Sequence, residues 1–176
     1  MAAVSPVPRE KAAPDVQPVY DQLAQTFGQV PSFYAVMAHR PAALKAFLTL
    51  YAAIMREGTV EPRLKELAYL KTSLLNGCEY CTRAHTAAAK RVGVTDEQIR
   101  ALAFYERSPL FTEQEKAVVL YAERLTRGAA AMRDGTLEDL RAHFDEGQIV
   151  ELTLVVCAAN FTNRFNDGLR HAPDLG

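Results

Sequence analysis

Apolar residues recur every three or four positions along most of the chain, and short breaks rich in glycine, proline and polar residues separate these periodic stretches. The clearest stretch follows Pro41, where helical spacing relates Leu44, Phe47, Leu48, Tyr51 and Ile54. No segment alternates apolar and polar residues in the way that is typical of a β-strand. The pattern therefore predicts an all-α fold.

The breaks assign boundaries to the individual helices. Gly28 ends a first helix that begins at Asp15 or Val16, and Pro62 opens a later one, in a position where proline is tolerated. Capping-box patterns begin at Thr95 and Thr112. The other predicted helices run from Ser32 to His39, from Pro41 to Gly58, from Thr136 for a short distance, and from Asp145 or Gly147 to about Asn163.

A weak internal repeat organises these helices. The pair Glu66-Leu67 recurs as Glu151-Leu152, an offset of 85 residues (151 − 66), and Leu50-Tyr51-Ala52 resembles Leu120-Tyr121-Ala122. We therefore expect a single domain, residues 15–170, built from two pseudo-repeats. The predicted segments are a flexible N-terminal arm at 1–14, an active repeat at about 41–105, a degenerate repeat at about 112–170 and a C-terminal tail at 171–176.

Composition excludes several classes of protein. The 176 residues are 49% hydrophobic and 23% charged with a net charge of −1, which gives no electrostatic reason to expect a nucleic acid or an anionic membrane as partner. The first eight residues lack the regions of a signal peptide, and no apolar run reaches the ~20 residues that span a bilayer. Three cysteines, two of them close together, argue against a secreted disulfide scaffold. We expect a cytoplasmic protein.

The close cysteine pair carries the candidate chemistry. Cys78 and Cys81 precede the strongly helix-forming stretch 86–91, so we expect them on the first turn of a helix, where free amide hydrogens and the helix dipole favour a thiolate. Their spacing makes a disulfide geometrically plausible. His85 follows Cys81 by four residues, so its imidazole is placed to accept the thiol proton or to stabilise the thiolate.

Glu66 joins this group if the chain reverses at Asn76-Gly77. The helices before and after the turn then run antiparallel, and Glu66 and His85 lie at similar depths, roughly 15 Å and 10 Å from the tip. The carboxylate is then in reach of the imidazole, directly or through one water. A carboxylate, an imidazole and two thiols in line indicate a proton relay that serves a redox-active dithiol.

These residues resemble a known family. Glu66, then Cys78-Glu79-Tyr80-Cys81, then His85 is similar to the signature of the alkylhydroperoxidase D-like branch of the carboxymuconolactone decarboxylase family. The segments 31–34 and 160–167 extend the likeness to roughly residues 16–170. Some members have a histidine directly before the second cysteine, where this chain has Tyr80.

The resemblance implies a function and roles. It implies an oxidoreductase that reduces hydroperoxides, with Cys81 peroxidatic, Cys78 resolving, and Glu66 and His85 as proton relay. A thiol electron donor or partner redox protein would restore the dithiol, and no metal or organic cofactor would be required. It also implies a homo-oligomer, as a dimer, trimer or hexamer.

Other interpretations stay open. The chain could be a disulfide relay that reduces a partner peroxiredoxin, or a carboxymuconolactone-type decarboxylase, although that chemistry has no evident use for a dithiol. Cys78, Cys81 and His85, with Glu66 or Cys157, could instead hold a metal. We expect Cys157 to be a small buried hydrophobe. We expect Tyr80 to serve packing, and Glu151 to be a structural carboxylate paired with an arginine such as Arg164.

Overall fold

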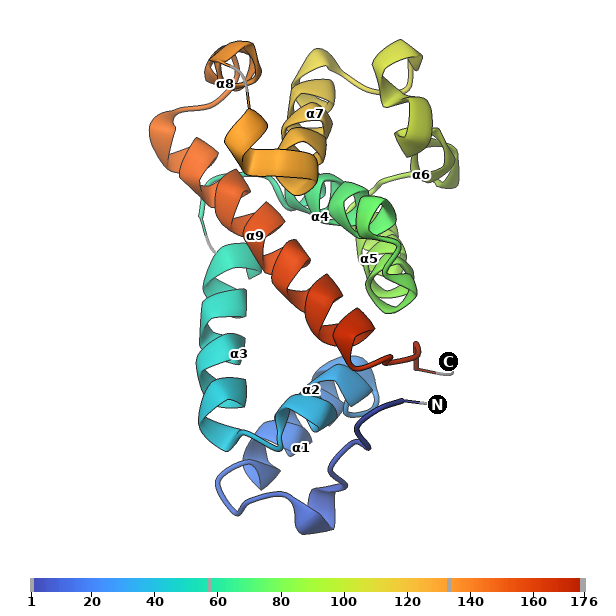
Figure 1. Ribbon diagram of the computed structural model, residues 1–176, viewed down its shortest axis with the longest axis vertical. Helices are drawn as coiled ribbons and strands as arrows, with labels where there is room; N and C mark the ends of the chain where they lie inside the picture. The colour runs from blue at the N-terminus through green and yellow to red at the C-terminus, as the bar shows by residue number, and fades with distance from the viewer. Residues whose placement is uncertain (1, 57, 133, 175–176) are drawn as a thin grey trace.

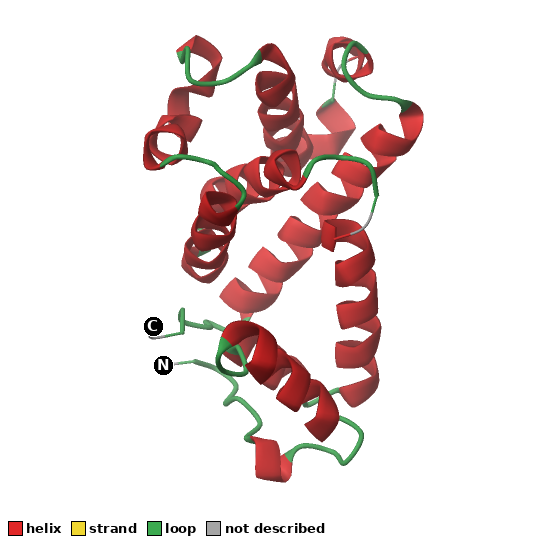
Figure 2. Ribbon diagram, turned by 180° about the vertical axis from the view of Figure 1, so that it is seen from behind, coloured by secondary structure: helices red, strands yellow, loops and turns green. Residues whose placement is uncertain are grey.

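The computed structural model describes residues 2–56, 58–132 and 134–174, and these residues form helices and no strand (Figures 1 and 2). The all-α prediction is confirmed. The α-helices are α1 (Gln17–Phe27), α2 (Ser32–Met37), α3 (Pro41–Arg56), α4 (Pro62–Asn76), α5 (Glu79–Arg91), α6 (Asp96–Ala101), α7 (Glu113–Gly128), α8 (Asp134–Arg141) and α9 (Glu146–Gly168). Short 3-10 helices span Arg9–Lys11, Leu102–Arg107 and Ala129–Ala131.

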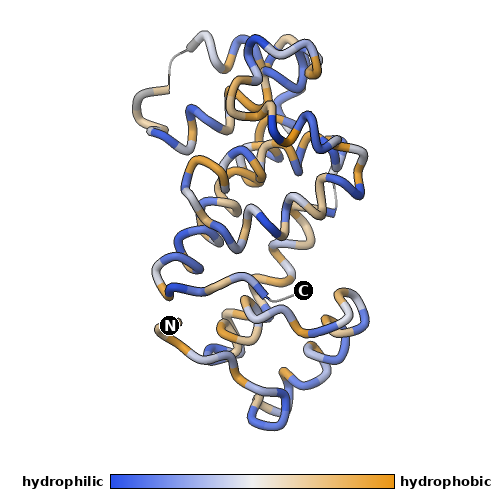
Figure 3. Tube along the Cα trace, turned by 90° about the vertical axis from the view of Figure 1, so that its right-hand side faces the viewer, coloured by the Kyte–Doolittle hydropathy of each residue, from blue (hydrophilic) through white to orange (hydrophobic). Residues whose placement is uncertain are grey.

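The longest helix, α9, crosses the middle of the molecule, and α4 packs against α5, α7 and α9 (Figure 1). Helices α1 and α2 lie at one end, and α6 to α8 lie at the other. Apolar and hydrophilic segments alternate along the helices (Figure 3), as expected for helices that bury one face. Buried residues form two clusters, a larger one around α4, α7 and α9 and a smaller one around α1, α2 and the start of α3.

The two predicted capping boxes, at Thr95 and Thr112, are present, and Asp145 forms a third. Each of these side chains accepts a hydrogen bond from the backbone N–H three residues later, and the side chain at that position bonds back to the cap. The last helix continues five residues beyond the predicted end at Asn163 (168 − 163), because no helix breaker intervenes before Gly168.

Gly77 creates the break that positions the cysteines. Its φ of 70° is left-handed, a conformation that glycine adopts without a Cβ penalty, and it ends α4. Cys78 follows as the N-cap of α5, in extended conformation, and Cys81 lies in the first turn. The antiparallel α4–α5 pair expected from the sequence is therefore formed.

Both terminal segments lie against the body of the protein. In the expected arm, the Ala3 N–H donates to the Leu169 carbonyl across 2.8 Å and the Val7 N–H to the Ala35 carbonyl across 2.9 Å. In the expected tail, Asp174 accepts a hydrogen bond from the Ser32 N–H. Met1 and residues 175–176 of these two segments lie outside the described residues.

Glu151 is a structural carboxylate, but its partner is not an arginine. It pairs with the buried Nζ of Lys65 at 2.5 Å and accepts from the backbone N–H groups of Thr59 and Val60. Arg164 instead donates to the Asn160 carbonyl at 3.3 Å. Glu151 thus links α9 to α4 and to the loop after α3.

Within the described residues, no helix is both long enough and apolar enough to cross a bilayer.

Candidate active site

Glu66 and His85 meet directly between α4 and α5. The His85 Nδ1 lies 2.7 Å from the Glu66 Oε2, so the contact expected from the antiparallel helices is confirmed without an intervening water. The ring of Tyr69 stacks on the imidazole, with centroids 3.4 Å apart and planes inclined by 14°. The His85 ring is therefore held by a carboxylate at one nitrogen and by an aromatic face.

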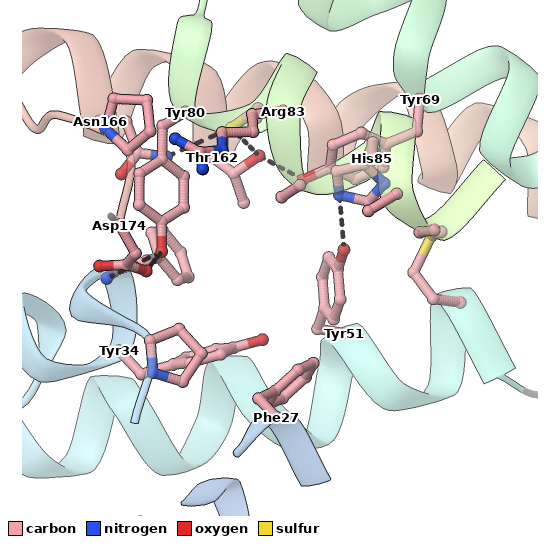
Figure 4. Close-up of a pocket in the computed structure, with 18 of the residues that line it drawn as sticks. Phe27, Tyr34, Tyr51, Tyr69, Tyr80, Arg83, His85, Thr162, Asn166 and Asp174 are labelled. Atoms are coloured by element: carbon pink, nitrogen blue, oxygen red, sulfur yellow. Dashed lines mark hydrogen bonds between the residues drawn. The ribbon is translucent and has the colours of Figure 1, made fainter. Parts of the chain in front are cut away.

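The second nitrogen of His85 faces α3 rather than the cysteines. Its Nε2 lies 3.2 Å from the Tyr51 hydroxyl (Figure 4). With both ring nitrogens engaged in this way, the described structure contains no hydrogen bond between His85 and Cys81. The direct contact expected from their four-residue spacing is replaced by a longer path, because the imidazole is turned toward Tyr51 and Glu66.

Cys81 is surrounded by polar groups of α9. The Asn166 Nδ2 donates to its sulfur across 3.2 Å, and the Thr162 Oγ1 lies 3.8 Å from the same atom. Asn163 also interacts with Cys81. Cys78 and Cys81 are 0% and 3% exposed, so these protein groups replace water around the sulfur atoms.

The two thiols are made unequal by their contacts. The hydrogen bond from the Cys78 thiol is the main cause that lowers the pKa of Cys81 to about 6, and Asn163, Asn166 and Thr162 lower it further against the opposing effect of burial. The same bond to Cys81, followed by burial, raises the pKa of Cys78 far above its ordinary value. The arrangement therefore favours a thiolate at Cys81 and a protonated thiol at Cys78.

Hydroxyl groups connect Cys81 to His85. Thr162 is hydrogen-bonded to the Tyr69 hydroxyl, Tyr69 interacts with the Tyr51 hydroxyl, and Tyr51 reaches the His85 Nε2. Burial raises the pKa of both tyrosines well above the ordinary value, so they stay protonated at neutral pH. The result is a line of exchangeable protons from Cys81 through Thr162, Tyr69 and Tyr51 to the His85–Glu66 pair.

A cavity of about 560 Å³ opens beside this line. Cys81, His85 and Asn166 contribute to its wall, whereas Cys78 does not. Tyr34, Tyr51, Tyr80 and Phe27 stand around the central space in Figure 4. Of the two thiols, Cys81 is the one presented to a molecule in the cavity.

Tyr80, between the two cysteines in sequence, packs against both hydrophobic clusters, as its predicted packing role requires. Its hydroxyl also donates to the Asp174 Oδ2 across 2.8 Å and accepts from the Phe33 N–H across 3.3 Å. The tyrosine thereby joins α5 to α2 and to the C-terminal segment at one side of the cavity (Figure 4).

The prediction that Cys157 is buried was wrong. It is exposed on α9, whereas Cys78 and Cys81 are buried. The apolar run around Cys157 surrounds the whole helix, so one side of that run is left in solvent. The metal-ligand set that included Cys157 is not brought together. In the described part of the chain, no group of three His, Cys, Asp or Glu side chains is placed to hold a metal ion.

The chain is similar to known proteins over most of its length. Residues 41–124 match the profile of the carboxymuconolactone decarboxylase family. A solved structure from Agrobacterium tumefaciens, called a protein of unknown function and linked in its name to AhpD, is 31% identical, has a TM-score of 0.73, and aligns over 78% of this chain and 94% of its own. This chain belongs to the carboxymuconolactone decarboxylase family, in its AhpD-like branch.

Two further matches have lower sequence identity. The uncharacterized protein YdfG of Bacillus subtilis is 28% identical over 112 residues, which are 63% of this chain and 76% of that protein. The debrominase Bmp8, solved as a variant in complex with 2,3,4-tribromopyrrole, is 22% identical with a TM-score of 0.85, over 99% of this chain and 92% of its own. At that identity the likeness shows the shared helical fold of the AhpD-like branch.

Sequence reasoning missed the residues between Cys81 and His85 in this AhpD-like protein. Tyr51 and Tyr69 lie at helical spacing among apolar residues and read as core. The internal repeat did contain a signal for Asn163 and Asn166. With the 85-residue offset they are the counterparts of Cys78 and Cys81 in the second half (78 + 85 and 81 + 85). From the sequence, the offset indicates only a degenerate second repeat, whereas in the structure Asn166 contacts Cys81.

Proposed function

We propose that this protein is a thiol peroxidase that reduces organic hydroperoxides through Cys81 and Cys78. The observation that carries the proposal is the asymmetry of the pair: the more acidic thiol, Cys81, lines a cavity of about 560 Å³, and Cys78 does not line it. A nucleophile at the cavity and a protonated partner bonded to it suit a two-step cycle.

In the first step the Cys81 thiolate attacks the terminal oxygen of R–O–O–H. A sulfur–oxygen bond forms, the O–O bond breaks, and the alkoxide leaves with a proton as R–OH, so that sulfur is oxidised and peroxide is reduced. In the second step the Cys78 thiol attacks the Cys81 sulfenic acid, which forms the disulfide and releases water. A dithiol donor then returns two electrons and two protons.

Three groups support the first step. The Asn166 Nδ2 stabilises the attacking sulfur, and the Asn166 Oδ1 is buried without a hydrogen-bond partner among the described residues, so it is free to accept the O–H of a bound hydroperoxide. The Thr162 hydroxyl is the end of the proton line nearest to Cys81. In the structure this hydroxyl donates to the Ala159 carbonyl across 3.0 Å, so it must turn away from that acceptor to pass a proton to the leaving alkoxide. Tyr69, Tyr51 and the His85–Glu66 pair then replace the proton.

The near-complete burial of both sulfur atoms bears on the rival relay function. A folded partner could reach a Cys78–Cys81 disulfide only if the site opened, whereas a small dithiol can enter the cavity. This favours a small-molecule donor and direct peroxide reduction over reduction of a partner peroxiredoxin. The decarboxylase alternative leaves the acidic thiol without a role.

Steady-state turnover with peroxide and a small dithiol donor tests the proposal. We expect saturable consumption of cumene hydroperoxide with one alcohol formed per peroxide, and loss of this activity in Cys81→Ser. Release of bromide from tribromopyrrole without peroxide turnover would assign the thiol the chemistry named for Bmp8. Slow turnover with peroxide alone and fast turnover with an oxidised peroxiredoxin would assign the relay.

A further inference from the structure

We propose that the cavity selects hydroperoxides that combine an apolar, aromatic body with a carboxylate, and that Arg56, Arg83 and Arg91 bind the carboxylate. The inference rests on the proposed peroxidase function and deepens it by naming the class of substrate. It follows from the walls, the charges and the spacing of the cavity.

The walls suit an aromatic body. The cavity is lined by the rings of Phe27, Phe33, Tyr34, Phe47, Tyr51 and Tyr80. Phe33 makes edge-to-face contacts with Tyr34 and Phe47, with centroids 5.1 Å and 5.4 Å apart, so the rings hold one another in place. A volume of about 560 Å³ lies within the range of sites that enclose drug-sized ligands, and hydrogen peroxide would leave most of it unfilled.

The charges at the cavity are predominantly positive. Arg56 lies at the end of α3, and Arg83 and Arg91 lie on α5. None of these three arginines forms an ion pair with another described residue. The cavity also contains two carboxylates, and both are engaged.

Those two carboxylates do not neutralise the positive charge of the arginines, because both carboxylates have other partners. Glu66 is bound to His85 at 2.7 Å, and Asp174 accepts from the Tyr80 hydroxyl and the Ser32 N–H. Three guanidinium groups therefore remain for an incoming anion. Guanidinium is suited to this because its planar fork matches a carboxylate with two parallel hydrogen bonds.

The spacing along α5 places the anion at a distance from the reacting sulfur. Arg83 and Arg91 are separated by eight residues, with Ala84, Ala87 and Ala88 between them on the cavity wall. At a helical rise of 1.5 Å per residue, the backbone of Arg91 lies about 15 Å along the helix axis from that of Cys81. The alanines leave room over this distance, so a substrate that extends along α5 can place its peroxide at Cys81 and its carboxylate near Arg91.

The test compares one pair of substrates that differ only in charge. Cumene hydroperoxide and its 4-carboxylate share the same ring and the same peroxide. We expect kcat/KM to be about tenfold higher for the carboxylate, which corresponds to one charge-assisted contact. We also expect the advantage to shrink as salt is raised, because the arginines are exposed. Hydrogen peroxide should be the poorest substrate.

Single substitutions assign the effect to the arginines. Arg83→Gln, Arg91→Gln and Arg56→Gln should each lower the ratio of kcat/KM for the carboxylate to kcat/KM for the neutral hydroperoxide. Arg107→Gln is the matched control, because Arg107 is exposed and does not line the cavity. An unchanged preference in all three variants overturns the assignment.

A binding measurement separates this inference from the proposed function. Calorimetry on the reduced protein compares 2-phenylpropan-2-ol, the product alcohol, with its 4-carboxylate. The inference requires tighter binding of the carboxylate in the unmodified protein and loss of that difference in Arg91→Gln or another of the arginine variants. Equal affinities overturn the inference while peroxide turnover stands. Tight carboxylate binding without turnover of any hydroperoxide overturns the proposed function and, with it, the assignment of a hydroperoxide as substrate.

Discussion

The side-chain amide of Asn166 donates to the sulfur of Cys81 across 3.2 Å, and these two residues are 85 positions apart, the offset that relates the two halves of the chain. The second half therefore does more than preserve a helical framework. At the position equivalent to Cys81, it supplies a hydrogen-bond donor to that cysteine.

Replacing Asn166 with alanine should raise the pKa of Cys81. The amide bond favours the thiolate, and a hydrogen bond to a charged group stabilises it by an amount that corresponds to about one pKa unit. Activity that rises through about pH 6 in the unmodified protein should rise at higher pH in the variant. Thiolate absorbance against pH measures the shift. Asn160→Ala is the control, because Asn160 bonds to Asn76 and Thr126 rather than to sulfur. Equal shifts in both variants would contradict the assignment.

The two cysteines should differ when each is replaced by serine. With Cys78→Ser, peroxide should oxidise Cys81 to a sulfenic acid that persists, because no resolving thiol follows. With Cys81→Ser, the remaining thiol has a raised pKa and does not line the cavity, so no sulfenic acid should form at the pair. Trapping with a dimedone reagent and mass spectrometry distinguish the variants. Cys157→Ser in both backgrounds removes the exposed thiol as a source of signal. A trapped sulfenic acid only in Cys81→Ser would exchange the roles.

Peroxide should join Cys78 to Cys81 and leave Cys157 as a thiol. The sequence motivated this by helix-start spacing and by an apolar setting for Cys157. The second reason changes: Cys157 is exposed, whereas Cys78 and Cys81 are buried and hydrogen-bonded to each other, so we expect Cys157 to stay unpaired. A bulky maleimide should therefore modify Cys157 in the native reduced protein much faster than Cys78 or Cys81. Peptide mapping before and after peroxide gives the result, and a stable intramolecular disulfide to Cys157 would refute it.

Glu66→Gln should lower peroxide turnover by about 100-fold, the usual effect of losing a positioned acid–base group. If His85 contacted Cys81 directly, as the four-residue spacing suggests, this substitution would also raise the pKa of Cys81. Because Tyr51, Tyr69 and Thr162 lie between them, we now expect the pKa of Cys81 to change little. Tyr69→Phe should reproduce the loss of turnover, since it retains the ring on His85 but removes the hydroxyl of the proton line.

Thiol titration and peroxide turnover, measured on Glu66→Gln and Tyr69→Phe, test whether the hydroxyl groups between Cys81 and His85 carry protons. Glu10→Gln, an exposed change in the 3-10 helix before α1, is the control and should leave both measurements unaltered. Full activity in Tyr69→Phe would mean that protons reach the leaving group by another path.

Glu151→Gln should destabilise the fold without reducing turnover per folded molecule. Burial alone would raise the pKa of this carboxyl, but the bonds from Lys65, Thr59 and Val60 hold it below the ordinary value. Its contribution to stability is therefore present at neutral pH and is lost as the pH falls below about 4. We expect a loss of about 3 kcal/mol in the free energy of unfolding at pH 7. The acid dependence should be weaker in the variant, as denaturant unfolding across pH would measure. An acid dependence identical to that of the unmodified protein would remove Glu151 from this role.

The sequence predicted the parts of the site that depend on local signals. Gly77, Pro62 and the spacing of Cys78, Cys81 and His85 fix the α4–α5 pair, and the helical rise places Glu66 beside His85. What the sequence could not give was the rotation of one helix about its axis against another. That rotation decides that the Tyr69 ring covers the imidazole and that Thr162 faces Cys81.

Cys157 illustrates the same limit. The run 154–159 is apolar on every side, so no polar face indicates which direction points to solvent. The helix presents Leu152, Val155 and Val156 to the core, and Cys157 is turned outward with Leu154. An amphipathic helix such as α7 allows its buried face to be predicted, whereas the middle of α9 does not.

The break at Gly77 has a counterpart 85 positions later at Thr162, where α9 runs on without interruption (162 − 77). In the first half a helix ends at Gly77, and the thiol pair lies at the start of the next helix. In the second half the helix is continuous, and its side chains face that pair. If the halves arose by duplication, the first has kept the thiol pair and the second now supplies the polar side chains that contact it. A shorter protein carrying only the Cys78–Cys81 half would have to obtain the missing amide and hydroxyl from a neighbouring subunit. In this chain both halves are joined, so the polar groups that contact Cys81 come from the same chain.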